Sequence, residues 1–269
     1  MNALWWRQIV GILRLEIRKN LFSSRALPLY MMSAIPLVIV TIFIAVTTAF
    51  DDIPREFEGP GGATMLFAAI FHLAILRTTL YFACVWVFMN LFRGEVLDRS
   101  LHYYFLAPVR RDVLVAGKFL SALVGTLVAF GAVTTICFIA LQVHLGAGSA
   151  FAASGHLLAY LAIIAMACVG YGAIFMVAGL FMKNPVIPAL VVFFWEGVNT
   201  LLPALLKKFS VIFYLQSLFP VDISEGPIEI ISEPVPLWIG VPGFIVFSGL
   251  MLVLAGLQIR RKEIDYGED

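Results

Sequence analysis

Six long apolar runs dominate the chain and leave few folds open to it. Each is about as long as, or longer than, the 20 residues that a helix needs to cross a hydrocarbon core about 30 Å thick. Transmembrane strands would instead show segments of about 10 residues in which apolar and polar positions alternate, and these runs are apolar on all sides. The sequence therefore predicts an all-α membrane protein whose six spans cover residues 28–50, 64–92, 119–143, 156–181, 186–206 and 237–259.

Composition supports the same class. Hydrophobic residues make up 61% of the chain and charged residues 13%, whereas soluble domains average about 45–50% and 25%. Cys84, Cys137 and Cys168 all lie inside apolar runs, where small packing roles are expected instead of disulfides or metal ligation. We expect one transmembrane domain over residues 1–269.

Basic residues are distributed unevenly between the two sides of the six runs, and this predicts the orientation. With the N-terminus in the cytoplasm, only Arg55, Lys207 and Lys208 fall in outer segments and Arg77 falls within a run, so 14 of the 18 Lys and Arg residues are inside. We therefore expect a multi-pass protein of the cell's inner (cytoplasmic) membrane with both termini in the cytoplasm.

The segment before the first run, residues 1–26, has the pattern of an amphipathic helix. On a helix, Arg7, Arg14 and Arg18 fall along one stripe and the apolar side chains, among them Trp6 and Leu13, fall opposite. A helix of this kind lies in the membrane interface. We expect it to lie flat on the cytoplasmic face.

The largest inner segment, residues 93–118, reads "RGEVLDRSLHYYFLAPVRRDVLVAGK" and joins the second and third runs. Helical sequence is expected on both sides of Pro108, which breaks it. After the break a short helix is expected to restart, with Asp112 near its positive N-terminal end and Val113 and Leu114 available for contacts. A short amphipathic helix that projects from a membrane domain is expected to dock a partner.

At these residues the chain resembles the membrane subunits of ABC exporters of the ABC-2 type, which include bacterial polysaccharide and drug exporters and the membrane half of the ABCG proteins. The shared pattern is a glutamate after the second run, a leucine-containing turn that ends in "PVRR", an apolar pair, and a Gly-Lys pair that enters the third run. The resemblance also covers the interfacial helix, the six runs and the long outer segment before the last run. It implies that the inner segment is a coupling helix, whose docking residues are Glu95, Pro108, Arg110, Arg111, Asp112, Val113, Leu114, Gly117 and Lys118.

The same resemblance implies partners. A phosphate-binding loop needs G-x-x-x-x-G-K-[ST], but the Gly117-Lys118 pair is followed by Phe119 and has Asp112 at the position of the first glycine. The chain is therefore not expected to be an enzyme or to hold a cofactor or metal. The resemblance implies two copies of a separate ATPase subunit that binds ATP and Mg, a second permease subunit of the same or another chain, and an outer re-entrant segment over residues 207–236. No nucleic-acid partner is expected.

Three ionisable residues fall inside apolar runs, where charge is costly and polar groups usually face the bundle interior or a cavity. Glu196 lies in the fifth run with Asn199 one turn further on, and His72 and Arg77 lie in the second run. These residues are candidates for a polar lining of a translocation path. The alternative, that they hold helices together or extend to the interface, stays open.

The sequence thus predicts the permease subunit of an ATP-driven exporter. Two alternatives remain at this point: a membrane scaffold or assembly subunit without transport, and an ion-coupled secondary transporter that uses Glu196. The carried substrate, whether lipid, glycan, peptide or drug, does not follow from the sequence.

Overall fold

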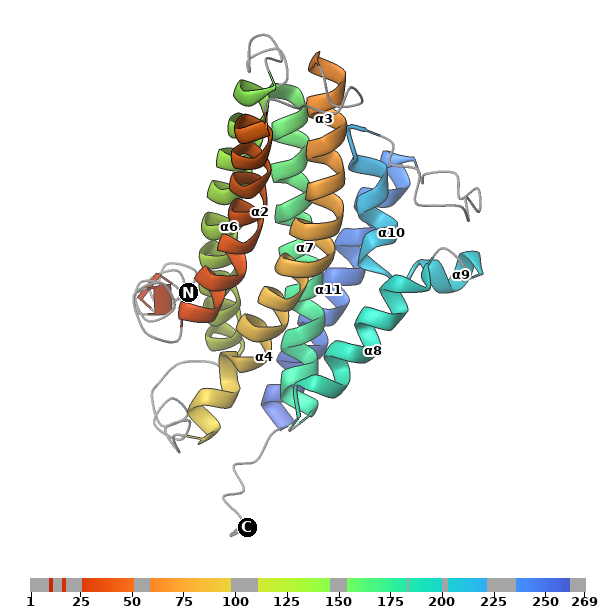
Figure 1. The fold of residues 1–269 in the computed structure, drawn as a ribbon. Coiled ribbons are helices and arrows are strands. Elements are labelled where there is room, and N and C mark those ends of the chain that lie inside the picture. The colour runs from red at the N-terminus through yellow and green to blue at the C-terminus, as the bar shows by residue number, and fades with distance from the viewer. Residues whose placement is uncertain are drawn as a thin grey trace.

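The computed structural model describes residues 10–11, 16–17, 26–50, 59–97, 111–145, 154–182, 184–199, 203–221 and 236–261 (Figure 1). All regular structure in these ranges is helical, with no strand among them. Five helical stretches are long and apolar enough to cross a membrane by length and composition. The predicted class, an all-helical protein with several membrane-spanning helices, agrees with this architecture.

Four of the five stretches are single α-helices, and the remaining one is built from three elements that follow each other without a break. They lie side by side in one elongated bundle (Figure 1). The single helices are α2 (Leu27–Phe50), α6 (Arg111–His144), α7 (Ser154–Phe181) and α11 (Leu237–Arg261), and the composite stretch contains α3 (Gly59–Ile70), η3 (Phe71–Leu80) and α4 (Tyr81–Leu97).

The middle element of the composite stretch, η3, is a π-helix of 10 residues. Two threonine hydroxyls donate to carbonyls five residues back: Thr78 Oγ1 to Leu73 O at 2.7 Å and Thr79 Oγ1 to Ala74 O at 2.9 Å. π-Helical turns are rare and occur frequently at functional sites. Both ionisable residues of this run, His72 and Arg77, lie in η3.

Helix α7 lies at the centre of the bundle and packs most extensively against α4, with α11 and α6 on other sides. The contact with α4 depends on a glycine, because a β-carbon on Gly179 would lie 2.7 Å from Met89 O and 2.9 Å from Met89 Cα. Small residues allow helix backbones to approach closely in membrane proteins. Gly179 therefore sets the distance between α7 and α4.

A cluster of buried aromatic rings joins the composite stretch to α6 and α7. The ring of Phe67 lies 5.0 Å from that of Phe138 and 4.9 Å from that of Tyr160, and Phe71 lies 4.5 Å from Tyr160. Edge-on and tilted rings at these separations contribute about 0.5–1.5 kcal/mol per pair beyond burial of their surface. These contacts hold the composite stretch, α6 and α7 against one another.

The predicted fifth span, residues 186–206, is not a continuous helix. Helix α8 (Val186–Gly197) is about 18 Å long, too short for a hydrocarbon core of about 30 Å, and it ends in a turn at Val198. Two further short helices follow, α9 (Ala204–Lys207) and α10 (Val211–Leu215), and a 3-10 turn, η5 (Gln216–Leu218), continues α10. In Figure 1, α8 rises from the end of α7 toward mid-bundle, α9 points away from the bundle, and α10 turns back onto it.

The expected separate helix before the third run is not formed either. Helix α6 continues without a break from Arg111 to His144, because a single glycine, Gly117, does not end a helix. Val113 and Leu114 are buried within the chain's own core, so they are not left free for contacts as the sequence suggested. Helix α6 thereby carries the third run well beyond its apolar part.

Several predicted segments lie partly outside the described residues. Of the interfacial helix expected over residues 1–26, the structure describes 10–11 and 16–17, which are helical, and residue 26. Of the inner segment 93–118 it describes 93–97 and 111–118 and leaves out Pro108 and Arg110. Of the outer segment 207–236 it describes 207–221 and 236.

Candidate functional site

The break between α8 and α10 is organised around the carboxylate of Glu196. Its Oε1 accepts a hydrogen bond from Val211 N at 2.8 Å, and its Oε2 accepts from Ser210 Oγ at 2.5 Å and from Ile212 N at 3.2 Å. The first backbone N–H groups of a helix have no partner within the helix. Glu196, at the end of α8, thus caps the start of α10.

Ser210 makes the turn into α10 possible. It is the residue before the helix, and its hydroxyl accepts from Phe213 N at 3.4 Å while donating to Glu196. Serine is strongly preferred at this position because its side chain substitutes for the missing helical acceptor. On the other side of the turn, Tyr214 Oη donates to Lys208 O at 2.9 Å. Local sequence and the distant carboxylate therefore cooperate in starting α10.

Arg77 meets the same break from the π-helical segment. Its Nη2 donates to the backbone carbonyl of Glu196 at 3.4 Å, one of the carbonyls near the end of α8. Carbonyls at a helix C-terminus carry partial negative charge, which a guanidinium stabilises. Arg77 thus lies beside Glu196, as expected if both line a translocation path, and the hydrogen bond that joins them uses the backbone carbonyl of Glu196.

Helix α8 is otherwise held loosely. Of its residues only Pro188, Ala189 and Glu196 are buried, and Tyr81 Oη donates to Ala189 O at 2.6 Å. A buried hydroxyl bonded to a carbonyl contributes about 0.5–1.5 kcal/mol net. This bond attaches the first half of α8 to α4.

A cavity of about 150 Å³ lies at the break, with a guanidinium, a carboxylate and two phenols among apolar walls. Pockets for drug-sized ligands are about 300–1,000 Å³, and a water molecule takes about 30 Å³ in the liquid. The space therefore suits a few waters or a small ion and is too small for a lipid, glycan, peptide or drug. Its lining residues are Arg77, Tyr81, Tyr171, Phe193, Glu196, Gly197 and Ile212.

The other two residues expected at this site lie beside it. Asn199 follows the end of α8 and is buried, and its Oδ1 has no hydrogen-bond partner among the residues that the structure describes. His72 is buried in η3 with its ring 5.3 Å from that of Phe219, just after η5. Neither residue lines the cavity. Ser210 and Tyr81 were missed from the sequence, where a serine before an apolar stretch was the available sign of a helix start.

The residues expected to dock an ATPase divide into three groups. Lys118 is buried, with Nζ 3.0 Å from Glu16 Oε1 and 3.5 Å from Leu91 O. Gly117, like Val113 and Leu114, is also buried. The other residues lie at or beyond the helix ends, namely Glu95 in the last turn of α4, Arg111 and Asp112 in the first turn of α6, and Pro108 and Arg110 outside the described ranges.

The ion pair of Lys118 joins three parts of the chain: the segment that contains Glu16, the end of α4 and the start of α6. The two residues are 1% and 3% exposed. A buried ion pair is stable only when its geometry is good and further hydrogen bonds accompany it, and the Leu91 carbonyl supplies one. Lys118 therefore has a structural partner within its own chain.

Comparisons with known proteins add no assignment. No family model matches the sequence, and a search of curated proteins finds no match. Among the described residues, no group of three or more His, Cys, Asp or Glu side chains could hold a metal ion.

Proposed function

We propose that the chain is the permease subunit of an ATP-driven ABC exporter, working as a dimer with separate ATPase subunits. The observation that carries the proposal is the junction at one end of the bundle. There the Lys118–Glu16 pair ties the N-terminal segment to the end of α4 and the start of α6, directly beside the segment whose residues resemble an ABC-2 coupling helix. A docking segment needs a firm attachment of this kind to pass force into the membrane domain.

The arrangement of helix ends supports the orientation in this proposal. The end of α4, the start of α6, the connection from α7 to α8 and the end of α11 all lie at the same end of the bundle (Figure 1). Together with the N-terminal segment, these segments hold 14 of the 18 Lys and Arg residues, and loops rich in Lys and Arg stay on the cytoplasmic side. We assign this end to the cytoplasm, where ATPase subunits would bind.

Helix α6 offers a route for coupling. It is one helix of 34 residues, about 51 Å long, and begins at Arg111 within the proposed docking segment. A rigid helix moves as a unit, so displacement of its first turn by an ATPase would tilt its membrane part against α7 and α2, both of which it contacts. This is a hinge or rigid-body route to alternating access.

The geometry at Glu196 weighs against the ion-coupled alternative. Its carboxylate already accepts from Ser210, Val211 and Ile212, and a transported ion would have to displace these donors. We propose instead that Glu196, with Arg77, positions two short helices along the pathway, α8 in its cytoplasmic half and α10 in its outer half. The same proposal places Asn199 and His72 beside that pathway.

Copurification from native membranes tests the function. The chain is expected to bring down an ATPase subunit in equal amount, and the complex is expected to hydrolyse ATP while the isolated chain does not. A transport-active complex without an ATPase would support the ion-coupled alternative. A stable complex with neither ATPase nor transport would support the scaffold alternative.

An arginine variant tests the docking segment itself. Arg110→Ala with Arg111→Ala is expected to reduce ATPase capture, most strongly at low salt, because charges at the rim of an interface mainly affect association and salt screens them. The matched control is Lys207→Ala with Lys208→Ala, at the end of α9, which points away from the bundle and lies apart from the docking segment (Figure 1). Equal ATPase capture by wild type and the arginine variant would show that this segment does not dock the ATPase.

A further inference from the structure

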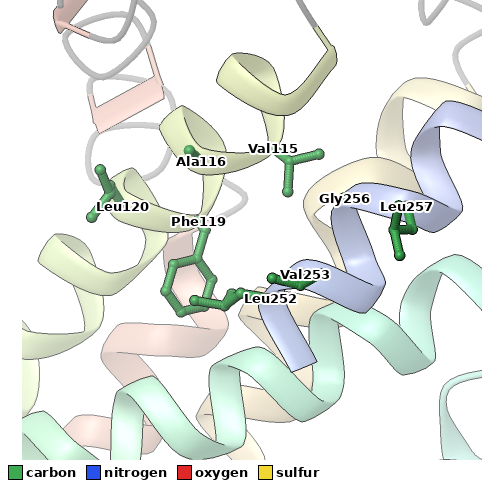
Figure 2. Close-up of a pocket in the computed structure, with 8 residues that line it drawn as sticks. All are labelled: Val115, Ala116, Phe119, Leu120, Leu252, Val253, Gly256 and Leu257. Atoms are coloured by element: carbon green, nitrogen blue, oxygen red, sulfur yellow. The ribbon is translucent and has the colours of Figure 1, made fainter. Parts of the chain in front are cut away.

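An apolar groove of about 550 Å³ lies between the first turns of α6 and the last turns of α11. Figure 2 shows Phe119 of α6 pointing toward Leu252 and Val253 of α11. Among the residues that the structure describes, no polar side chain lines the groove, and its volume falls in the range of ordinary ligand pockets. Its lining residues are Val115, Ala116, Phe119, Leu120, Leu252, Val253, Gly256 and Leu257.

The groove lies near the boundary of the expected hydrocarbon region. Its α6 residues belong to the first ten of a helix about 51 Å long, which exceeds the hydrocarbon thickness of about 30 Å. Its α11 residues belong to the last ten of α11 (Leu237–Arg261). An acyl chain of the adjacent leaflet can therefore reach the groove from the membrane side.

The helix ends next to the groove carry an excess of basic residues. Arg260 and Arg261 stand four residues after Gly256 and Leu257, in the last turn of α11. Arg111 stands four residues before Val115 in the first turn of α6, next to Asp112. Three arginines and one acid therefore stand at the two helix ends next to the groove. Lys118 does not add to this charge, since it is paired with Glu16.

We propose that this groove binds an anionic phospholipid, with an acyl chain along the apolar walls and the headgroup at the arginine positions. Basic pockets between transmembrane helices on the cytoplasmic side bind anionic headgroups. A second copy of the chain is the less suitable occupant, because a symmetric contact would bring two sets of the same arginines together. The proposal rests on the proposed assignment of this end of the bundle to the cytoplasm and holds whether or not an ATPase partner exists.

Native mass spectrometry of the full chain in dodecyl maltoside tests the proposal, with dioleoyl phosphatidylglycerol and dioleoyl phosphatidylcholine as probes. Phosphatidylglycerol is expected to remain bound in preference. Gly256→Leu should remove this bound lipid, because the added side chain enters the open space of the groove. Gly249→Leu is the matched control, since a β-carbon at Gly249, like one at Gly256, meets no atom within 4 Å.

A charge variant tests the contact with the headgroup separately from the contact with the acyl chain. It leaves the groove open. Arg260→Gln with Arg261→Gln should lower retention of phosphatidylglycerol roughly 25-fold, since each basic residue near the headgroups contributes about fivefold, and should leave phosphatidylcholine unchanged. The control is Lys207→Gln with Lys208→Gln. Equal retention of both lipids by wild type, or equal loss in both glycine variants, would overturn the proposal. A change of oligomeric state in Gly256→Leu without loss of lipid would overturn it in favour of a second copy.

Discussion

Lys118 of α6 and Glu16 of the N-terminal segment form a buried ion pair, with Nζ 3.0 Å from Oε1, although 102 positions separate them in the sequence. Removing one partner leaves the other charge buried without compensation, which costs about 3–5 kcal/mol. Lys118→Met and Glu16→Leu are each expected to lower the melting temperature in detergent. Lys207→Met, at a half-buried lysine, serves as the control.

The double variant of this pair gives the sharper measurement. Lys118→Met with Glu16→Leu removes both charges together, and replacement of a whole buried pair by apolar residues is often neutral. It should therefore be more stable than either single variant. If the double variant is as unstable as the sum of the two singles, the charges do not stabilise each other.

Glu196→Ala should disorder the start of α10. The substitution leaves the N–H groups of Val211 and Ile212 without their acceptor, and each buried donor left unsatisfied costs about 1–3 kcal/mol. Hydrogen exchange at these two amides should become faster, while exchange in α7 stays slow. Unchanged exchange at Val211 and Ile212 would show that the carboxylate is not their cap.

The hydroxyls of Ser210 and Ser217 allow the contribution of the cap at α10 to be compared with that of an ordinary hydrogen bond within a turn. Ser210 Oγ donates to Glu196 and accepts from Phe213 N, whereas Ser217 Oγ donates to Tyr214 O in its own turn. Ser210→Ala is expected to lower stability by about 1–2 kcal/mol, the usual loss for a helix cap, and Ser217→Ala by less. Thermal unfolding of the two variants in the same detergent provides the comparison.

Tyr81 and Tyr160 form a second matched pair. Tyr81 Oη donates to Ala189 O at 2.6 Å, whereas Tyr160 Oη is buried without a hydrogen-bond partner among the described residues. Tyr81→Phe should lower stability by about 0.5–1.5 kcal/mol, because it removes one buried hydrogen bond. Tyr160→Phe should be neutral or stabilising. A cysteine-accessibility assay at the exposed Val191 checks whether α8 loosens in Tyr81→Phe and not in Tyr160→Phe.

Gly179→Ala should separate α7 from α4. The new β-carbon would lie 2.7 Å from a backbone oxygen of Met89, and backbone shifts forced by overpacking cost about 1–3 kcal/mol. Gly131→Ala is the control, because its β-carbon would lie at an ordinary 3.7 Å from a side-chain atom of Leu161. Equal melting temperatures for the two variants would show that the contact at Gly179 relaxes without cost.

The sequence predicts the long helices well because their signal is local. A run such as 156–181 is apolar on all sides and as long as a membrane is thick, and α7 covers it almost residue for residue. The π-helical segment was not foreseen: Phe71–Leu80 contains His72, Arg77 and two threonines, but no spacing of these residues in the sequence distinguishes a π-helix from an α-helix.

The features missed at the candidate site depend on residues distant in sequence. Glu196 was visible in the sequence as an interruption of the fifth run. Its partners are the amides of Val211 and Ile212, which follow a turn that no short sequence pattern predicts. Lys118 was assigned to docking through a resemblance, whereas its burial depends on Glu16. Whether the remaining docking residues contact an ATPase stays a prediction.

The cap at Glu196 has a consequence for membrane insertion during synthesis. When α8 leaves the ribosome, its carboxylate precedes its partners Ser210, Val211 and Ile212 by 14 to 16 residues. An uncompensated charge within the membrane is costly, and α8 is too short to span the hydrocarbon core, so α8 alone is a poor candidate for entry as a single helix. We therefore expect α8 to enter the membrane together with α10, as a folded pair. A chain truncated before Ser210 would leave its final apolar helix at the membrane surface.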